Sequence, residues 1–91
     1  MMRANSSETV GDVVRYHRRR AGLSQHALAE LAGIGKTSVF DVERGKQTTR
    51  LTTLMAMFRV LNIDVELDGP LMAECRSALE GESGTDMDVL R

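Results

Sequence analysis

Residues 23–46 have the sequence LSQHALAELAGIGKTSVFDVERGK, and this stretch decides the fold. Ser24 is a favourable helix N-cap and Gly33 a favourable stop, so the residues between them are predicted to form a short helix. Its apolar residues share the spacing of one helical face and are expected to be buried: Ala27, Leu28, Leu31 and Ala32.

A second short helix is predicted from Lys36 to Glu43, with Gly45 ending it. Val39 and Val42 are the apolar residues expected on its buried side. Two short helices joined by a brief turn that contains glycine form the helix-turn-helix pattern.

Longer helices are predicted on both sides of this pair. The first is capped by Thr9 and ends at Gly22, and the last runs from Leu51 to about Leu61. The expected buried positions of the first are Val10, Val13, Val14, the stems of His17 and Arg18, and Ala21. Those of the last are Leu51, Leu54, Met55, Phe58, Leu61 and Ile63, and at helical spacing the stripe with Met55, Met57 and Phe58 indicates core, not a cofactor site.

Beyond Asn62 the pattern changes to alternation. Ile63, Val65 and Leu67 fall on one side, with Asp64, Glu66 and Asp68 on the other, until Gly69-Pro70 interrupts it. This predicts a single strand. Because unpaired backbone donors and acceptors are unfavourable, the strand is expected to pair with the same strand of a second copy.

The chain is therefore divided into four parts. We expect a flexible N-terminal arm at 1–8, a helix-turn-helix domain at 9–63, a dimerisation strand and turn at 64–70, and a short helix with an acidic tail at 71–91. The arm is interpreted as disordered, with DNA contact as the alternative. The segment with helical spacing in the last part holds Leu71, Met72, Cys75, Ala78 and Leu79.

The net charge of −1 conceals an uneven distribution. Residues 1–62 hold ten Lys and Arg against five acids, whereas residues 63–91 hold two arginines against eight acids. A basic front of this kind indicates a polyanion-binding face. The single cysteine, the arginines where a signal peptide would be apolar, and the lack of an apolar run near 20 residues predict a cytoplasmic, nucleoid-associated protein without a membrane span.

Catalytic chemistry is not predicted. His17 and His26 fall on different predicted helices without a matching carboxylate and nucleophile, and no glycine-rich phosphate loop is present. We therefore expect no enzymatic activity, no metal and no cofactor. His17 is interpreted as a packed or half-exposed side chain, with a ligand or base as the alternative. His26 is interpreted as a solvent-facing side chain near a helix start, with a phosphate contact as the alternative.

The motifs of residues 23–46, together with LTTLMAMFRVL at 51–61, resemble the Cro/phage-repressor (Xre-type) helix-turn-helix family. The resemblance covers about residues 9–63. It implies an all-α, lambda-repressor-like bundle of four to five helices that binds a double-stranded DNA operator as a homodimer, here with one short C-terminal strand pairing across the dimer. It also implies a structural ion pair between Arg18 and Glu43.

Position within such a fold assigns roles, because the major groove admits one helix whose first residues face the base edges. The base-reading residues are expected to be Lys36, Thr37, Ser38 and Asp41. For Asp41 the alternative is a role in helix solubility only. Residues expected to contact phosphate are Gln25, by its resemblance to a family position, and Arg44, Lys46, Gln47, Thr48 and Thr49, for which plain solvent exposure is the alternative.

Within the family, TTRLTT at 48–53, the alternating strand and the acidic tail look most like HipB-type antitoxins. That resemblance implies a repressor of its own HipBA-like operon that also neutralises a HipA-like toxin kinase. The alternatives are a stand-alone Xre-type transcriptional regulator without a toxin, and a protein-interaction adaptor. The dimer contact would involve Ile63, Val65 and Leu67.

Overall fold

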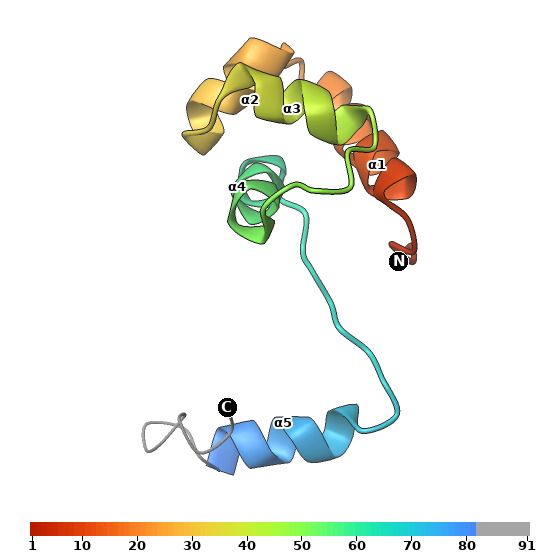
Figure 1. Cartoon of the computed structure of the whole chain (residues 1–91). Coiled ribbons are helices and arrows are strands. Elements are labelled where there is room, and N and C mark those ends of the chain that lie inside the picture. The colour runs from red at the N-terminus through yellow and green to blue at the C-terminus, as the bar shows by residue number, and fades with distance from the viewer. Residues whose placement is uncertain (82–91) are drawn as a thin grey trace.

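A computed structural model describes residues 1–81, and within them the chain forms five helices. Their bounds are α1 Ser7–Arg20, α2 Gln25–Ala32, α3 Lys36–Glu43, α4 Leu51–Leu61 and α5 Met72–Gly81. Helices α1 to α4 pack into a bundle, and α5 lies apart from it at the end of an extended segment (Figure 1). Residues 82–91, the end of the predicted acidic tail, lie outside the described part.

Helix α1 begins earlier than the sequence pattern predicted. Ser6, not Thr9, is the N-cap, since its backbone is extended and its Oγ accepts a hydrogen bond from the Thr9 amide at 3.1 Å. Both residues carry a hydroxyl that suits a cap, so local sequence does not separate them. Residues 7 and 8, assigned to the arm, therefore belong to the helix.

The buried face of α1 is also narrower than expected. Gly11, Val14 and Arg18 are buried, whereas His17 and Ala21, both predicted to line the core, are exposed. The buried residues follow one line at spacings of three and four, and His17 lies beside that line. Its Nδ1 is 2.8 Å from the Val13 carbonyl oxygen of its own helix.

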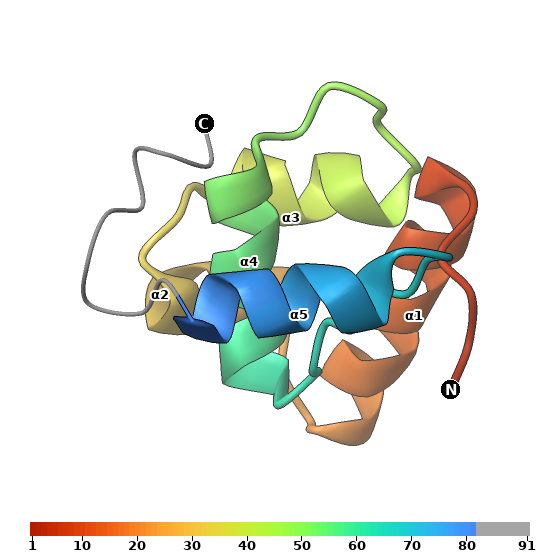
Figure 2. The same ribbon diagram turned by 90° about the horizontal axis from the view of Figure 1, so that it is seen from below.

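The helix-turn-helix has the predicted bounds. Ser24 caps α2 by accepting a hydrogen bond from the Ala27 amide at 2.9 Å. Gly33 ends the helix with φ +69°, a conformation that side chains other than glycine adopt with strain. The chain then turns through Ile34 and enters α3 after Gly35. Figure 2 gives a second view of α2 and α3 beside α4.

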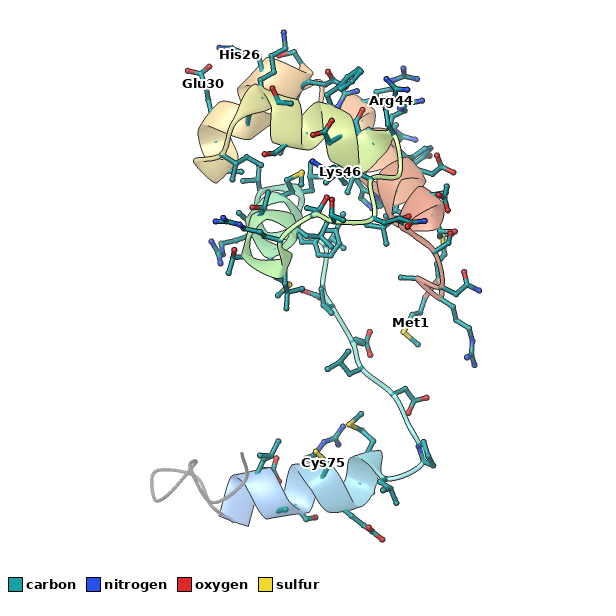
Figure 3. The ribbon with its side chains drawn as sticks, viewed as in Figure 1. Met1, His26, Glu30, Arg44, Lys46 and Cys75 are labelled. Atoms are coloured by element: carbon teal, nitrogen blue, oxygen red, sulfur yellow. The ribbon has the colours of Figure 1, made fainter. Side chains whose placement is uncertain are left out.

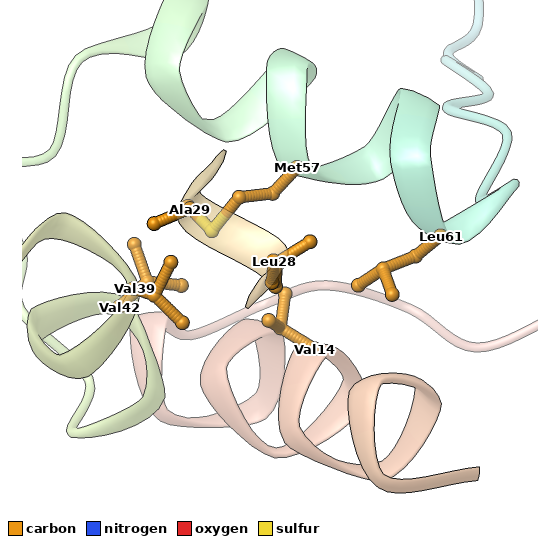
Figure 4. Close-up of a cluster of buried hydrophobic side chains, with 7 residues drawn as sticks. All are labelled: Val14, Leu28, Ala29, Val39, Val42, Met57 and Leu61. Atoms are coloured by element: carbon orange, nitrogen blue, oxygen red, sulfur yellow. The ribbon is translucent and has the colours of Figure 1, made fainter. Parts of the chain in front are cut away.

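The core lies where the first four helices meet (Figure 4). Its buried members are Val14, Leu28, Ala29, Val39, Val42, Met57 and Leu61. Leu31, Leu51 and Met55 were expected here and are instead exposed. The apolar surfaces of α2 and α4 are wider than the faces that neighbouring helices cover, and periodicity alone does not show which part is covered.

Gly11 is a packing position that the sequence pattern did not reveal. A Cβ atom placed on it would lie 2.3 Å from the Val42 carbonyl oxygen and 3.1 Å from that of Glu43. Only glycine therefore allows α1 to approach the C-terminal end of α3 this closely. The backbones of α1 and of the end of α3 are therefore in close contact at this point.

Residues 63–69 form an extended segment without strand pairing in the single chain (Figure 1). A strand needs a hydrogen-bonded neighbour, and the described residues supply none for it. Val65 is 48% exposed and Leu67 78% exposed, while Ile63 is half-buried against the core. Helix α5 forms where helical spacing was noted, and none of its residues is buried.

No helix among residues 1–81 is both long enough and apolar enough to cross a membrane.

Candidate nucleic-acid interface

Helix α3 presents a polar face away from the bundle. Lys36 and Thr37 are exposed and Ser38 and Asp41 are half-buried, while Val39 and Val42 on the opposite face are buried. The helix therefore separates a packed side from a side available to a ligand. The N-cap residue is Gly35, which has no side chain, so no cap side chain accepts a hydrogen bond from the amides of the first turn.

Asp41 is paired with a residue of the following loop. The Lys46 Nζ lies 3.4 Å from the Asp41 Oδ2, and the Lys46 amide donates to the Asp41 carbonyl at 3.0 Å. The lysine offsets the negative charge of the carboxylate on a surface that would meet phosphates. Asp41 was predicted either to read a base or to serve helix solubility only. Its contacts with Lys46 add a third interpretation, in which Asp41 positions Lys46.

A polar groove lies between α3, the loop after it and the start of α4. Its lining residues are Ser38, Asp41, Lys46, Thr48, Thr49, Arg50 and Thr53. Three of the loop residues predicted to contact phosphate therefore border the predicted base-reading residues. Gln47 lines a neighbouring hollow instead, shared with residues 4–7 of the N-terminal region.

Arg50 and Thr53 were missed by the sequence reasoning. Arg50 is exposed and directly precedes α4, and Thr53 is half-buried in the first turn of that helix. The sequence signal was a basic residue at the N-cap position of the helix, Arg50, with a polar residue three positions later, Thr53. The DNA contacts had been predicted only from α3, the loop after it and the start of α2.

Phe40 and Arg44 form a second feature that the sequence reasoning only half identified. Phe40 is 43% exposed, and the Arg44 guanidinium lies 5.2 Å from its ring centre. Figure 3 shows Arg44 projecting outward at the end of α3. Arg44 had been predicted as a phosphate contact, whereas Phe40 had been given no role although it is out of phase with the buried Val39 and Val42.

A buried charge network holds the far end of α3. Arg18 donates to Glu43 through Nε and through Nη2, the latter at 2.9 Å, and its Nη1 donates to the Leu23 carbonyl at 2.9 Å. The ion pair implied by the family resemblance is therefore present. It joins α1 to α3 and to the residue just before the α2 cap.

Gln25 and Arg15 complete this network. Gln25 Nε2 donates to Glu43 Oε1 at 3.1 Å, and Arg15 Nε approaches the same oxygen at 3.5 Å. Gln25, predicted to contact phosphate, thus has its amide nitrogen directed at Glu43, with its position at the start of α2 otherwise as expected. Arg15 had not been predicted to take part in this network.

The environment of Glu43 keeps it ionised. Burial alone would raise the pKa of this carboxyl, but hydrogen bonds from Arg18, Gln25 and Arg15 and the charge of Arg18 outweigh burial and lower the pKa below its ordinary value. Among the described residues, no buried side-chain nitrogen or oxygen lacks a hydrogen-bond partner. The buried charges that join α1 to the end of α3 are therefore paired and hydrogen-bonded.

The residues predicted for dimerisation lie away from this surface. Ile63 and Val65 line a hollow with the N-terminal arm and with Val10, Val13 and Phe58. Leu67 is exposed further along the extended segment. The structure therefore places the predicted DNA contacts and the predicted dimer contacts on different parts of the molecule.

The titratable residues that suit catalysis or metal binding do not converge. In the described part of the chain, no three side chains of His, Cys, Asp or Glu come together in a possible metal site. His26 lies on α2 beside Glu30, with 3.2 Å between Nε2 and Oε1, and both project from the surface (Figure 3). Cys75 is exposed on α5.

Comparison with known proteins agrees with this geometry. Residues 14–67 match the helix-turn-helix family. The chain is 36% identical over 58 residues to the control protein C.SmaI of Serratia marcescens, covering 64% of this chain and 69% of that protein. It is 28% identical over 68 residues to the uncharacterized HTH-type transcriptional regulator y4mF of Sinorhizobium fredii (strain NBRC 101917 / NGR234), covering 75% of this chain and 90% of that one. With the predicted turn, the outward face of α3 and this match over more than half its length, the chain belongs to the Xre-type helix-turn-helix family.

Proposed function

We propose that this protein is a sequence-specific DNA-binding transcriptional repressor that acts as a homodimer. The observation that carries the proposal is the outward polar face of α3 beside the groove of the following loop. A major groove is wide enough for one α-helix, and a supported helix with free polar side chains suits it. The names of both relatives, a control protein and a transcriptional regulator, support regulation as the task.

Roles follow from position on this surface. Lys36 donates to guanine acceptors, Thr37 and Ser38 contact neighbouring base edges, and Asp41 accepts from a cytosine amine or positions Lys46. The groups assigned to the phosphates are Gln25, Arg44, Lys46, Gln47, Thr48 and Thr49. These contacts supply affinity without sequence information.

The homodimer is formed by residues 63–67. Val65 and Leu67 are exposed in an extended segment whose backbone has no strand partner in the described chain, so pairing with a twofold mate would satisfy it. Two reading helices set about 34 Å apart then meet successive major grooves on one side of a near-palindromic site.

The test is a footprint on the DNA upstream of the gene, followed by titration at several salt concentrations. Affinity for the protected site is expected to fall steeply from low to physiological salt, because bound phosphates release counterions. Affinity that is insensitive to salt would contradict the phosphate contacts.

A double variant separates base reading from general attraction. Lys36→Ala with Thr37→Ala is expected to lose at least about tenfold in affinity for the protected site, since each good base contact contributes about 1–3 kcal/mol. Arg76→Ala is the matched control, because it also removes one positive charge and Arg76 is exposed on α5, outside the bundle that holds α3. Unchanged recognition by the first variant would refute the assignment of α3.

A second candidate is an antitoxin of a HipBA-like operon that also neutralises a kinase-like toxin. The observation that favours it is α5, none of whose residues is buried: Leu79 on this helix is 40% exposed, and Leu71 just before it is 65% exposed. Such a helix suits a protein partner. Co-purification with the product of the neighbouring gene tests this, and a chain that emerges alone from its native operon favours a stand-alone regulator.

A further inference from the structure

Phe40 is a large apolar side chain that does not belong to the core of the bundle. The chain has two phenylalanines, and the other, Phe58, packs against the core, whereas Phe40 is 43% exposed. It lies on the outward face of α3, one helical turn after Lys36 and Thr37 and one turn before Arg44. An aromatic ring therefore occupies the centre of the face proposed to read DNA.

The ring is also held in place. The Arg44 guanidinium lies 5.2 Å from the ring centre, within the range of a cation–π interaction. This contact restricts the ring on a helix that is itself fixed by the Gly11 approach and the Glu43 network. The contact favours one orientation of the ring before any ligand arrives, and a side chain restricted in this way loses less entropy on binding.

The neighbours of Phe40 match a nucleic acid better than a protein. Within α3 the other exposed side chains are those of Lys36 and Thr37, and the helix is followed by Arg44 and Lys46. A protein-docking patch would combine several apolar side chains, whereas here a single ring is surrounded by cationic and hydroxyl groups. In the major groove, the apolar feature of the base edges is the 5-methyl group of thymine.

We propose that Phe40 is a specificity-determining residue that packs on the 5-methyl group of a thymine in each half-site, with Arg44 stacked on the ring and directed toward the backbone phosphates. The inference rests on the proposed function as a DNA-binding dimer. It adds an apolar contact to a reading face otherwise assigned to hydrogen bonds.

The experiment removes the methyl group and nothing else. After the bound site has been defined by footprinting with the full-length chain, each thymine is replaced singly by uracil, and affinity is measured for the wild type and for Phe40→Ala and Phe40→Leu. One thymine per half-site is expected to matter to the wild type, with about a fourfold loss for each methyl removed. Phe40→Ala is expected to bind more weakly and to lose the response at that thymine, and Phe40→Leu to keep part of it.

Thr37 is the competing methyl-reading residue and provides the matched control. Thr37→Ser keeps its hydroxyl, loses its methyl group and is expected to keep the uracil response assigned to Phe40. If the response disappears in Thr37→Ser and persists in Phe40→Ala, the thymine is read by Thr37 and the inference is overturned.

The remaining outcomes separate the two proposals. Specific, salt-sensitive binding with the same uracil profile in Phe40→Ala and the wild type overturns this inference and leaves the proposed function standing. A wild type that binds no DNA sequence preferentially overturns both. A Phe40→Ala variant that folds, keeps the uracil profile and dissociates into monomers shows that Phe40 is a contact between protein chains.

Discussion

The bundle of residues 7–61 and the segment of residues 63–81 differ in how far they shield their apolar side chains from water. In the bundle, apolar side chains from four helices cover one another, and the buried charges of Arg18 and Glu43 are paired within the chain. In the C-terminal segment, Val65, Leu67, Leu71 and Leu79 are exposed, and none of residues 1–81 forms a strand beside the extended backbone. The bundle buries its apolar core within one copy, whereas the apolar side chains of the segment remain exposed in the described part of the chain.

Substitutions in the two regions are therefore expected to change different properties of the protein. A change in the bundle alters the stability of the fold and the support of α3. Under the proposed function, a change in the segment is expected to alter assembly and to leave the fold intact. Variants in the two regions distinguish an effect on stability from an effect on assembly.

Glu43→Ala is expected to lower the free energy of unfolding by about 3–5 kcal/mol, because Arg18 would remain buried without its partner. Urea denaturation of the variant and the wild type measures the difference. Glu30→Ala is the control, since that side chain is 70% exposed and its loss should change stability by less than about 0.5 kcal/mol. Equal effects of the two variants would show that the buried network contributes nothing to the bundle.

The contribution of Glu43 should also depend on pH. Its pKa is lowered in the folded protein, so the unfolded chain takes up a proton first as the pH falls, and the folded state loses stability from about pH 4.3 downward. The stability advantage of the wild type over Glu43→Gln should therefore be full at neutral pH and shrink through acid pH. Thermal unfolding of both proteins between about pH 3 and pH 7 tests this, and a constant difference would contradict it.

Gly11→Ala is expected to destabilise the bundle by about 1–3 kcal/mol, since the added methyl group would overlap the Val42 carbonyl and force α1 from α3. Gly69→Ala is the matched control, because a Cβ atom there meets its nearest neighbour, a Met72 side-chain atom, at 4.0 Å. The same denaturation assay compares the two. If Gly11→Ala matched Gly69→Ala, the close approach of the helices would not constrain the fold.

Proline substitutions test the proposed strand pairing. In a two-stranded ladder, successive amides alternate between facing the partner and facing solvent, so Val65→Pro and Glu66→Pro should act unequally. The one that removes a paired amide from both copies should weaken dimerisation by roughly tenfold, from hydrogen bonds of about 0.5–1.5 kcal/mol each. Sedimentation equilibrium measures this, and two variants that dimerise like the wild type would argue against pairing through this segment.

Leu79→Gln is expected to have the smallest effect on the fold. Leu79 is 40% exposed on a helix that buries none of its residues, so stability should change by less than about 0.5 kcal/mol. Leu28→Ala in the fully buried core is the contrast and should lose about 2–5 kcal/mol. A large loss of stability on changing Leu79 would show that α5 packs on the bundle in solution.

Local sequence accounts for the secondary-structure elements of the bundle. Ser24, Gly33 and Gly45 act through caps and left-handed turns that involve only neighbouring residues, and the bounds of α2, α3 and α4 follow from them and from helical periodicity. The family resemblance added the pairing of Arg18 with Glu43. These features depend on short stretches of chain or on a recurrent motif.

The tertiary structure alone decided which faces are covered. It exposed Leu51 and Met55, which periodicity had placed in the core, because only the line of α4 that meets the other helices is shielded from water. It placed Gly11 against the Val42 carbonyl, and it left Phe40 outside on α3. Each of these outcomes depends on the relative position of residues distant in sequence, which no local pattern encodes.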